Sequence, residues 1–290
     1  MKEYIIVAES TSDMPEYLVK ELGVVILPMT FLVDGEEYAD TPDHKSMPLR
    51  EFYEKQKNGA KGGTSAVNPT AIAEILRPHM AAGKDVLYLA FSSGLSMTYD
   101  NALKAQTAMG KQFPDNKFVV INTLAASLGQ GMLVHLAVKN QRAGMSLQDN
   151  ADFIEKTKNN LCHLFTVKDL FHLKRGGRVS GAVAILGTAL SIKPVLHVDN
   201  DGKLVPLCKV RGRTQSLDKL VDLAAERAIN PQEQVMFISH ADADKEAEYV
   251  KAELLKKVKP IDVIIGEVGP VIGNHAGSGT IALFLVGTEK

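Results

Sequence analysis

Tryptophan is absent from this sequence and aromatic residues make up only 6% of it, so Leu, Val, Ile, Ala and ten Met must supply most of the apolar core. Only two cysteines occur, Cys162 and Cys208, and they lack the close spacing of metal ligands. We expect both to be reduced, partly buried small hydrophobic residues, which suits a cytoplasmic protein. No apolar stretch approaches the roughly 20 residues of a membrane helix, and no signal-peptide pattern opens the chain. No integral membrane segment is therefore expected.

An excess of charge of one sign is also missing. The sequence has 33 Lys and Arg residues against 34 Asp and Glu, a net charge of -1, and the lysines are spread along the chain. This balance argues against nucleic acid as the main partner. A metal cofactor is not expected either. The segment SHADAD (239–244) contains ligand-type residues, but Asp242 and Asp244 are better explained as caps of the helix that should follow.

The 290 residues are enough for two α/β domains. The first, residues 1–160, alternates apolar strands (YIIVAE, DVLYLA, KFVVINT) with helices, which predicts a Rossmann-like, largely parallel sheet with helices on both faces. Asp13 is predicted to cap its first helix. The second, residues 161–290, contains a strong hairpin signal around Asn200, Asp201 and Gly202, within residues 191–213. This signal favours a mixed or antiparallel sheet with helices.

Two hydroxyl-rich segments follow predicted strands where helices are expected to begin. One is SSGLSMT (92–98), in which Ser93 precedes Gly94, and the other is GGTSAVNP (62–69), which contains Thr64 and Ser65. Ligands of open α/β sheets bind beyond the carboxyl ends of the strands, where unpaired N–H groups at helix starts favour anions. We interpret the two segments as one shared anion site. Helix capping by the same side chains is the alternative.

Arginines flank a diglycine in HLKRGGRVSG (172–181), where Arg175 and Arg178 can reach the same side of a tight turn. The planar guanidinium fork suits carboxylate and phosphate groups. Arg211 and Arg213, which leave the predicted hairpin, invite the same interpretation. For both pairs the alternative is a solvated basic turn without a ligand.

His275 lies among small residues in GPVIGNHAGSGT, where its ring can face a cleft, although a histidine in a loop is often only a surface residue. A Ser93–His275 pair fits no nucleophile template, because no glycine stands two residues before Ser93 and no orienting acid is evident. The P-loop lysine and a G-x-G-x-x-G segment after a strand are also missing. The residues therefore fit holding an anion better than cutting a bond. Two alternatives remain: a serine hydrolase acting on acyl esters, and a protein that binds a phosphorylated metabolite at the two helix starts.

In their order and spacing these segments resemble those of the DegV family, the fatty-acid-binding proteins that serve bacterial fatty acid kinase. The resemblance covers essentially the whole chain. It is carried by VAESTSDMP, GGTSAVNP, FSSGLSMTY, VINTLAASLGQG, LKRGGRVSG, IKPVLHVDNDGKL with KVRGR, and GPVIGNHAGSG. Each segment alone is a weak signal, whereas the complete ordered set is specific.

The resemblance implies that one long-chain fatty acid lies between the two domains. The family's carboxylate-binding residues match Thr64, Ser93 and His275 of this chain, with Ser65 and Gly94 beside two of them. The family's basic residues near the carboxylate match Arg178 and Arg211, where they are thought to serve phosphate transfer or kinase docking.

The resemblance also implies that the protein is not an enzyme by itself and binds neither ATP nor another cofactor. A separate ATP-dependent fatty acid kinase subunit converts the presented carboxylate to an acyl phosphate for phospholipid metabolism. Two departures from the family pattern concern the same region. Ala66 and Val67 follow the TS pair where Gln is common, and Met97 stands where a small residue is common, so no acyl-chain preference is implied.

Overall fold

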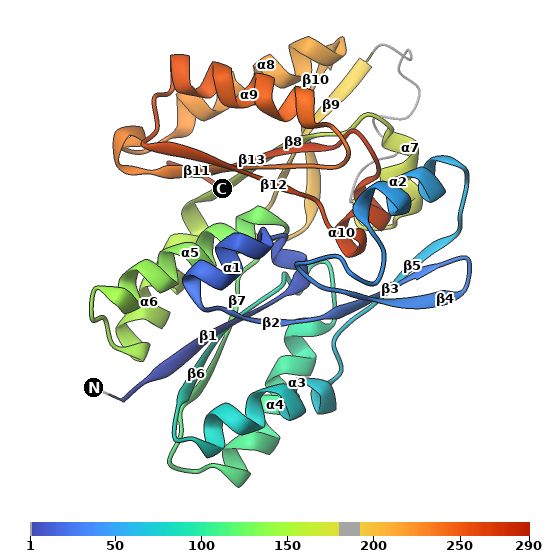
Figure 1. Ribbon diagram of the computed structural model, residues 1–290. Coiled ribbons are helices and arrows are strands. Elements are labelled where there is room, and N and C mark those ends of the chain that lie inside the picture. The colour runs from blue at the N-terminus through green and yellow to red at the C-terminus, as the bar shows by residue number, and fades with distance from the viewer. Residues whose placement is uncertain (1, 180–191) are drawn as a thin grey trace.

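In the computed structural model, which describes residues 2–179 and 192–290, the chain forms three sheets covered by helices (Figure 1). Sheet A is parallel, with strand order β2-β1-β6-β7. Its strands are β1 (Tyr4–Glu9), β2 (Val25–Leu27), β6 (Asp85–Ala90) and β7 (Phe118–Asn122). Helices α3 (Pro69–Ala81) and α4 (Thr98–Gln112) cover one face, and α1 (Glu16–Leu22), α5 (Leu128–Arg142) and α6 (Leu147–Thr157) cover the other. The predicted parallel sheet with helices on both faces is confirmed.

Sheet A is apolar on both faces because its central strands are buried on both sides. In β1, Ile6 and Ala8 belong to the core shared with α1, α5 and α6, whereas Val7 belongs to the core shared with α3 and α4. The continuous apolar runs in the sequence reflect this double burial, which is typical of parallel sheets.

Sheet B is a small antiparallel sheet that was not predicted as a separate unit. It has the order β4-β3-β5 and comprises β3 (Met29–Val33), β4 (Glu36–Asp40) and β5 (Gly62–Ser65). Helices α2 (Leu49–Lys57) and α10 (Pro270–Ala276) pack beside it, so a helix from near the end of the chain completes a layer of the first half. Phe31 of β3 and Phe52 of α2 form an edge-to-face pair in this core.

Sheet C is a six-stranded mixed sheet with the order β10-β9-β8-β13-β11-β12. Its strands are β8 (Leu161–Thr166), β9 (Ile192–Val198), β10 (Leu204–Arg211), β11 (Val235–His240), β12 (Asp262–Glu267) and β13 (Ile281–Val286). Among the described strand pairs of sheet C, β11–β12 alone is parallel and the others are antiparallel. Helices α8 (Arg213–Arg227) and α9 (Asp244–Lys257) cover the outer face, and short helix α7 (Leu170–Arg175) follows β8. The predicted mixed sheet and the β9–β10 hairpin are confirmed.

Helix α5 lies between sheets A and C and contacts both. Its side chains share one core with Leu87 and Leu89 of β6 and with Phe237 and Phe284 of sheet C. All strands of sheets A and B precede residue 123, and all strands of sheet C follow residue 160. The division into residues 1–160 and 161–290 stays a prediction, because this shared core joins the two halves.

Three local predictions were wrong, each at the start of a helix. Helix α1 begins at Glu16 after Pro15, and Asp13 adopts a left-handed conformation that turns its carboxylate toward Ser127 and the Gly269 N–H. Helix α3 is capped by Asn68, whereas Thr64 and Ser65 belong to strand β5. The third concerns α9: Asp242 and Asp244 were expected to cap this helix, but Ala243 is at its N-cap and no side chain makes a capping hydrogen bond.

Helix α4 begins only at Thr98, because Gly94 is followed by a turn in which the Leu95 and Ser96 N–H groups donate to the Ser92 carbonyl. The Leu95 and Ser96 N–H groups are therefore not free to bind an anion. Ser180 and Gly181 of HLKRGGRVSG, and Ser191 at the start of the predicted hairpin region, lie outside the described residues. Among the helices of the described part of the chain, none is long and apolar enough to cross a membrane.

Candidate functional site

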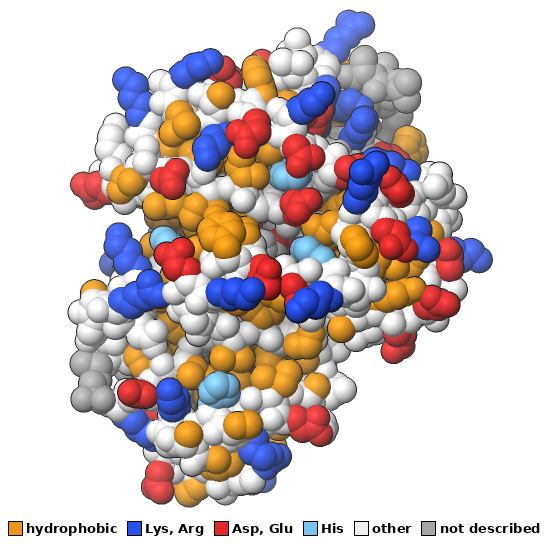
Figure 2. Space-filling view, in the orientation of Figure 1, with side chains coloured by type: hydrophobic (Ala, Val, Ile, Leu, Met, Phe, Trp, Pro, Cys, Tyr) orange, Lys and Arg blue, Asp and Glu red, His pale blue; other side chains and the backbone are white. Residues whose placement is uncertain are grey.

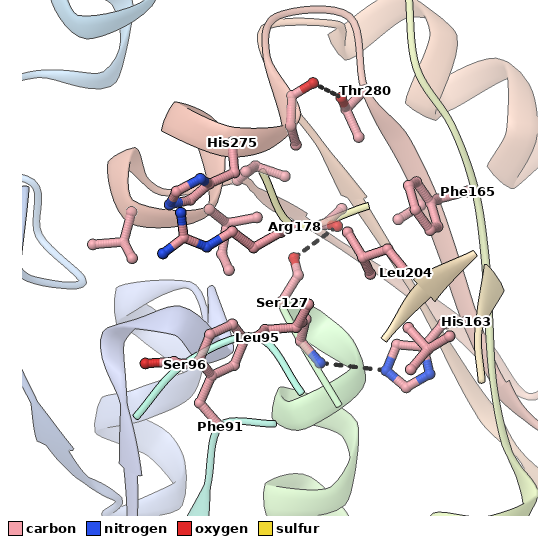
Figure 3. Close-up of a pocket in the computed structure, with 18 of the residues that line it drawn as sticks. Phe91, Leu95, Ser96, Ser127, His163, Phe165, Arg178, Leu204, His275 and Thr280 are labelled. Carbon is pink, nitrogen blue, oxygen red and sulfur yellow. Dashed lines mark hydrogen bonds between the residues drawn. The ribbon is translucent and has the colours of Figure 1, made fainter. Parts of the chain in front are cut away.

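A cavity of about 280 Å³ lies where the inner face of sheet C meets α10 and the segments that follow β5 and β6. Residues from both halves of the chain line it. Most of its wall is apolar and includes Phe91, Leu95, Phe165, Leu173, Val198, Leu204, Val268, Val271, Ile272, Ala282 and Phe284. In Figure 3, Ser96, Arg178 and His275 lie on one side of this cavity, and His163 and Phe165 lie on the other. The cavity is thus a mostly apolar space in which Ser96, Arg178 and His275 form one polar side.

Thr64 and His275 meet at the polar side. The Thr64 hydroxyl lies 2.9 Å from Nε2 of His275, and both residues line the cavity. Strand β5 can approach α10 this closely because it carries glycine: a Cβ on Gly62 would stand 1.9 Å from Oδ1 of Asn274. The Asn274 amide donates to the Gly63 carbonyl at 3.1 Å, which fixes the strand against the helix.

Ser65 does not share this position. Successive side chains of a strand point to opposite faces, so Thr64 and Ala66 face the cavity whereas Ser65 is exposed on the other face of β5. Ala66, one of the two departures from the family pattern, therefore lies directly at the cavity wall. Met97, the other departure, also lines the cavity and is 59% exposed.

The hydrogen bonds of His275 define which ring nitrogen carries the proton. Its Nδ1 lies 2.9 Å from the carbonyl of Gly176, which can only accept, so Nδ1–H donates and the neutral ring accepts from Thr64 through Nε2. Burial, with a smaller contribution from the Arg178 guanidinium, lowers the pKa of His275 to about 4. In this arrangement His275 is a neutral imidazole at neutral pH.

Arg178 lies next to His275 and binds the same carbonyl group. Its guanidinium donates to the Gly176 carbonyl at 3.0 Å, and Figure 3 shows it directed toward the His275 ring. A Cβ on Gly176 would stand 2.8 Å from the His275 carbonyl oxygen, so glycine is required at this contact. The diglycine of the predicted basic segment thus brings one arginine, Arg178, to the cavity.

The other predicted arginines lie elsewhere. Arg175 forms an ion pair with Asp169 at 3.8 Å, and Arg213 pairs with Glu246 and donates to the Gly279 carbonyl. Arg211 ends strand β10, is exposed and does not line the cavity. Of the four arginines considered from the sequence as candidates for binding an anion, Arg178 lines the cavity.

The SSG segment is used differently from the sequence-based interpretation. Ser93 is exposed and accepts a 2.7 Å hydrogen bond from the Asn122 amide, so it neither lines the cavity nor contacts His275. Ser92 is buried and donates to the Gly202 carbonyl at 2.7 Å. Ser96 is the serine of this segment that lines the cavity. The structure therefore does not form the Ser93–His275 pair that a serine hydrolase would need.

Gly94 serves the contact between this loop and the β9–β10 hairpin. A Cβ at Gly94 would lie 2.7 Å from the Asp201 carbonyl oxygen and 2.8 Å from that of Gly202. The turn of the hairpin packs directly onto the loop, which explains why a glycine is needed between the serines. Its role in the structure is close packing of backbone against backbone.

Glu9, which was not singled out from the sequence, bonds to the backbone at Phe91, just before the same loop. It is fully buried, and its carboxylate accepts from the Tyr88 hydroxyl at 2.6 Å, the Phe91 N–H and the Gln130 amide. Burial raises the pKa of Glu9, although these hydrogen bonds oppose the rise. The network fixes Phe91, where the cavity wall begins. The sequence signal that could have identified Glu9 is its position as a charged residue at the end of the apolar strand YIIVAE.

Four further polar residues line the cavity without having been predicted as part of it: Ser127, His163, Ser239 and Thr280. The Ser127 and Ser239 hydroxyls are 2.9 Å apart, and Ser127 also donates to the Asp13 carboxylate. His163 is 2% exposed, and burial lowers its pKa to about 3. Its Nε2 accepts from the Ala126 N–H at 3.4 Å, and its Nδ1 lies 3.2 Å from the Leu161 carbonyl. The hydrogen bonds described for these side chains are to other residues of the protein, so we infer that they shape this part of the cavity wall.

The side chains that the structure describes do not gather into a metal site. In residues 2–179 and 192–290, no group of three or more His, Cys, Asp or Glu side chains could hold a metal ion. Asp242 of the SHADAD segment instead pairs with Lys57 and accepts from the Ser278 hydroxyl. Both signs of charge are interspersed over the face seen in Figure 2, without a large field of either sign.

The family is shown by comparison with known proteins. The chain belongs to the DegV family, since the family model described as "Uncharacterised protein, DegV family" matches residues 4–288. A DegV domain-containing protein of Clostridium perfringens is 40% identical over 100% of this chain and 99% of its own length. One from Streptococcus pyogenes is 36% identical, with 99% of both chains covered.

Solved structures of related proteins share the fold. A DegV family protein from Thermus thermophilus, described by its fatty acid binding, has a TM-score of 0.87 and 30% identity, with 97% of this chain and 98% of its own covered. DegV from Bacillus subtilis, described as a fatty acid binding protein, has a TM-score of 0.85 and 26% identity, with 98% and 99% covered. The two-domain α/β architecture predicted from the sequence is thus the architecture of this family.

Proposed function

We propose that this protein binds one long-chain fatty acid in the cavity between its two halves. The observation that carries the proposal is the Thr64–His275 pair at the polar side of a mostly apolar cavity. The related proteins from Thermus thermophilus and Bacillus subtilis, described as binding fatty acids, support it. The carboxylate would lie at Thr64, Ser96 and His275, and the hydrocarbon chain would follow the apolar wall toward Phe165 and Phe284.

The head-group site suits a carboxylate that must remain chemically accessible. A carboxylate beside His275 would favour protonation of Nε2, because an opposite charge raises the pKa of a histidine. The Nε2–H and the Thr64 hydroxyl would then both donate to the ligand, while Nδ1–H keeps its bond to Gly176. In this arrangement Ser96 takes the position that the resemblance gave to Ser93, because Ser96 is the serine of that segment at the cavity.

The hydrocarbon chain would supply most of the affinity. Burial of about fifteen methylene groups contributes roughly 12 kcal/mol at about 0.8 kcal/mol for each group. Ordering of the chain and loss of its translational freedom offset part of this gain. The polar side chains therefore need only to satisfy the carboxylate and fix its direction.

We further propose that the bound carboxylate is presented to a separate ATP-dependent kinase subunit in the cytoplasm, which converts it to an acyl phosphate. Arg178 supports this step, because it lies beside His275 and can bind an added phosphate with a fork of N–H donors. Arg211 is the second candidate for contact with the kinase, since it is exposed at the end of β10.

Lipid extraction followed by mass spectrometry tests the binding proposal on the protein purified from an expression host. We expect one fatty acid for each chain, and its loss in a Thr64→Val, His275→Gln double variant. A protein that carries no fatty acid and does not take one up from solution would refute the proposal. Acyl-phosphate formation with a reconstituted kinase subunit tests the second step, with Arg178→Ala expected to reduce turnover while fatty acid binding is retained.

A further inference from the structure

A second cavity, of about 200 Å³, is lined in part by Asp13, which accepts a hydrogen bond from Ser127 of the first cavity. It is formed where the end of β4, the turn after β1, the start of α1 and the ends of β11 and β12 meet. Its titratable side chains are Asp13, Glu16, Asp40, His44, His240 and Glu267. Four carboxylates thus face two histidines, and among the described residues that line this cavity there is no Lys or Arg.

Asp40 contributes a carboxylate oxygen without a hydrogen-bond partner to the wall of this cavity. Its side chain is 2% exposed, yet Oδ2 has no hydrogen-bond partner. A carboxylate oxygen buried without a donor has lost its hydrogen bonds to water and gained none from the protein, which destabilises the fold. The nearby Ser10 hydroxyl and Val271 N–H oppose the effect of burial on the pKa of Asp40, but Oδ2 itself has no hydrogen-bond donor.

His44 provides a second buried atom without a partner. Its Nδ1 is unbonded and lies 3.9 Å from Oδ1 of Asp40, too far for a direct hydrogen bond. Burial lowers the pKa of His44, which keeps the ring neutral and lets Nδ1 accept a hydrogen bond. Asp40 Oδ2 and His44 Nδ1 are thus two acceptors of one cavity that call for a ligand with several donors.

The other titratable groups of the cavity favour a ligand with a positive charge. Asp13 is also buried, and burial together with the nearby Asp40 raises its pKa well above the usual range. Burial likewise raises the pKa of Asp40 to about 7. His240 accepts the Ala243 N–H through Nδ1, so it brings no compensating charge in its neutral form. A positive charge placed here would favour the ionised forms of Asp13 and Asp40 and would interact strongly with them in this poorly solvated space.

The same geometry distinguishes between classes of cation. A divalent metal ion takes many oxygen ligands, and no group of three suitable side chains in the described residues could hold one. A primary ammonium group offers three N–H donors and matches acceptors at hydrogen-bond distance. Met14 and Ile265 add apolar surface to the wall. We propose that this second cavity is a binding site for a small primary ammonium compound with a short apolar body.

Titration with ethylammonium chloride tests the proposal, with ionic strength held constant by KCl and the imidazole NMR signals of His44 and His240 as the readout. At about pH 8 we expect a saturable shift of both signals. Tetramethylammonium, which has the charge but no N–H donor, should produce none. MgCl2 and CaCl2 should also produce none. Neither the probe nor the readout requires a bound fatty acid, so the outcome is independent of the function proposed above.

Asp40→Asn keeps the shape of the side chain and removes its charge, and we expect it to weaken ethylammonium binding roughly tenfold to a hundredfold. Asp152→Asn, an exposed charge removal on α6, is the matched control and should bind as the native protein does. His44→Gln provides a second test if Asp40→Asn does not fold. Native binding should also weaken about tenfold from pH 8 to pH 6, because Asp40 is protonated as pH falls through its pKa of about 7.

No saturable shift in the native protein, an equal response to tetramethylammonium, or a response to divalent metal ions alone would overturn the proposal. Equal ethylammonium binding by the native protein and by folded Asp40→Asn would also overturn it.

Discussion

The hydroxyl of Thr64 lies 2.9 Å from Nε2 of His275, although 211 positions separate the two residues in the chain. The first comes from the edge of a small antiparallel sheet and the second from a seven-residue helix near the end of the chain. Their contact joins the two halves of the molecule at the polar side of the cavity.

Removing either partner of this pair should weaken fatty acid binding. Thr64→Val keeps the shape of the side chain but deletes one hydrogen bond to a charged ligand, which is worth about 1.5–3 kcal/mol, or roughly tenfold to a hundredfold in Kd. His275→Gln should have a similar effect. Competition with a fluorescent fatty acid measures the affinity. Ser65→Ala is the matched control, because its hydroxyl faces away from the cavity, and a loss as large as that of Thr64→Val would contradict the placement of the carboxylate.

The protonation of His275 should depend on the ligand. In the unliganded protein burial lowers its pKa to about 4, and a bound carboxylate should raise it, with each pKa unit worth about 1.4 kcal/mol of interaction. NMR titration of the imidazole signals, with and without fatty acid, measures both values. His163 is the internal reference, because its nitrogens lie against the backbone of Ala126 and Leu161. Identical His275 pKa values in the two states would show that the head group lies elsewhere.

His163 should make the stability of the fold depend on pH. Burial lowers its pKa to about 3, whereas in the unfolded chain a histidine titrates near about 6.5. Between these values the unfolded state binds a proton that the folded state does not, so stability is full above about pH 6.5 and decreases as pH falls. The slope approaches about 1.4 kcal/mol for each pH unit. Urea unfolding at several pH values measures it, and His163→Gln should flatten the dependence.

Two glycines should respond in opposite directions to the same substitution. Gly94→Ala places a Cβ 2.7 Å from the Asp201 carbonyl oxygen, so the hairpin turn must move, at a cost of about 1–3 kcal/mol. Gly110→Ala, within helix α4, meets nothing within 4 Å and should stabilise the protein by about 0.5–1 kcal/mol. Thermal unfolding of the two variants measures both effects. Equal effects would show that the contact between loop and hairpin is not tight.

The elements that could be predicted from the sequence are those determined by local pattern. YIIVAE and DVLYLA are continuous apolar runs because both faces of sheet A are buried, and the predicted strands coincide with β1 and β6. The hairpin could be predicted because its turn residues, including Gly202 with its positive φ, have a local conformational role.

What could not be predicted depends on contacts distant in sequence. Thr64 lies in a strand because β5 pairs with β3, and no local signal distinguishes this from a helix start. Ser93 and Ser96 look alike in the sequence, and only the turn after Ser92 directs Ser96 to the cavity. Asp13 carries the signature of a cap, but its partner Gly269 is 256 positions away.

Helix α5, wedged between sheets A and C, restricts how a ligand can enter. Leu128 and Met132 belong to the same core as Phe237 and Phe284, so swinging the halves apart would expose that core to water. At about 25 cal/mol for each Å² of apolar surface, a hinge opening of this kind would consume much of the stability of the fold. We therefore expect the fatty acid to enter and leave through small displacements of residues around the cavity rim, while the two halves of the chain stay packed together.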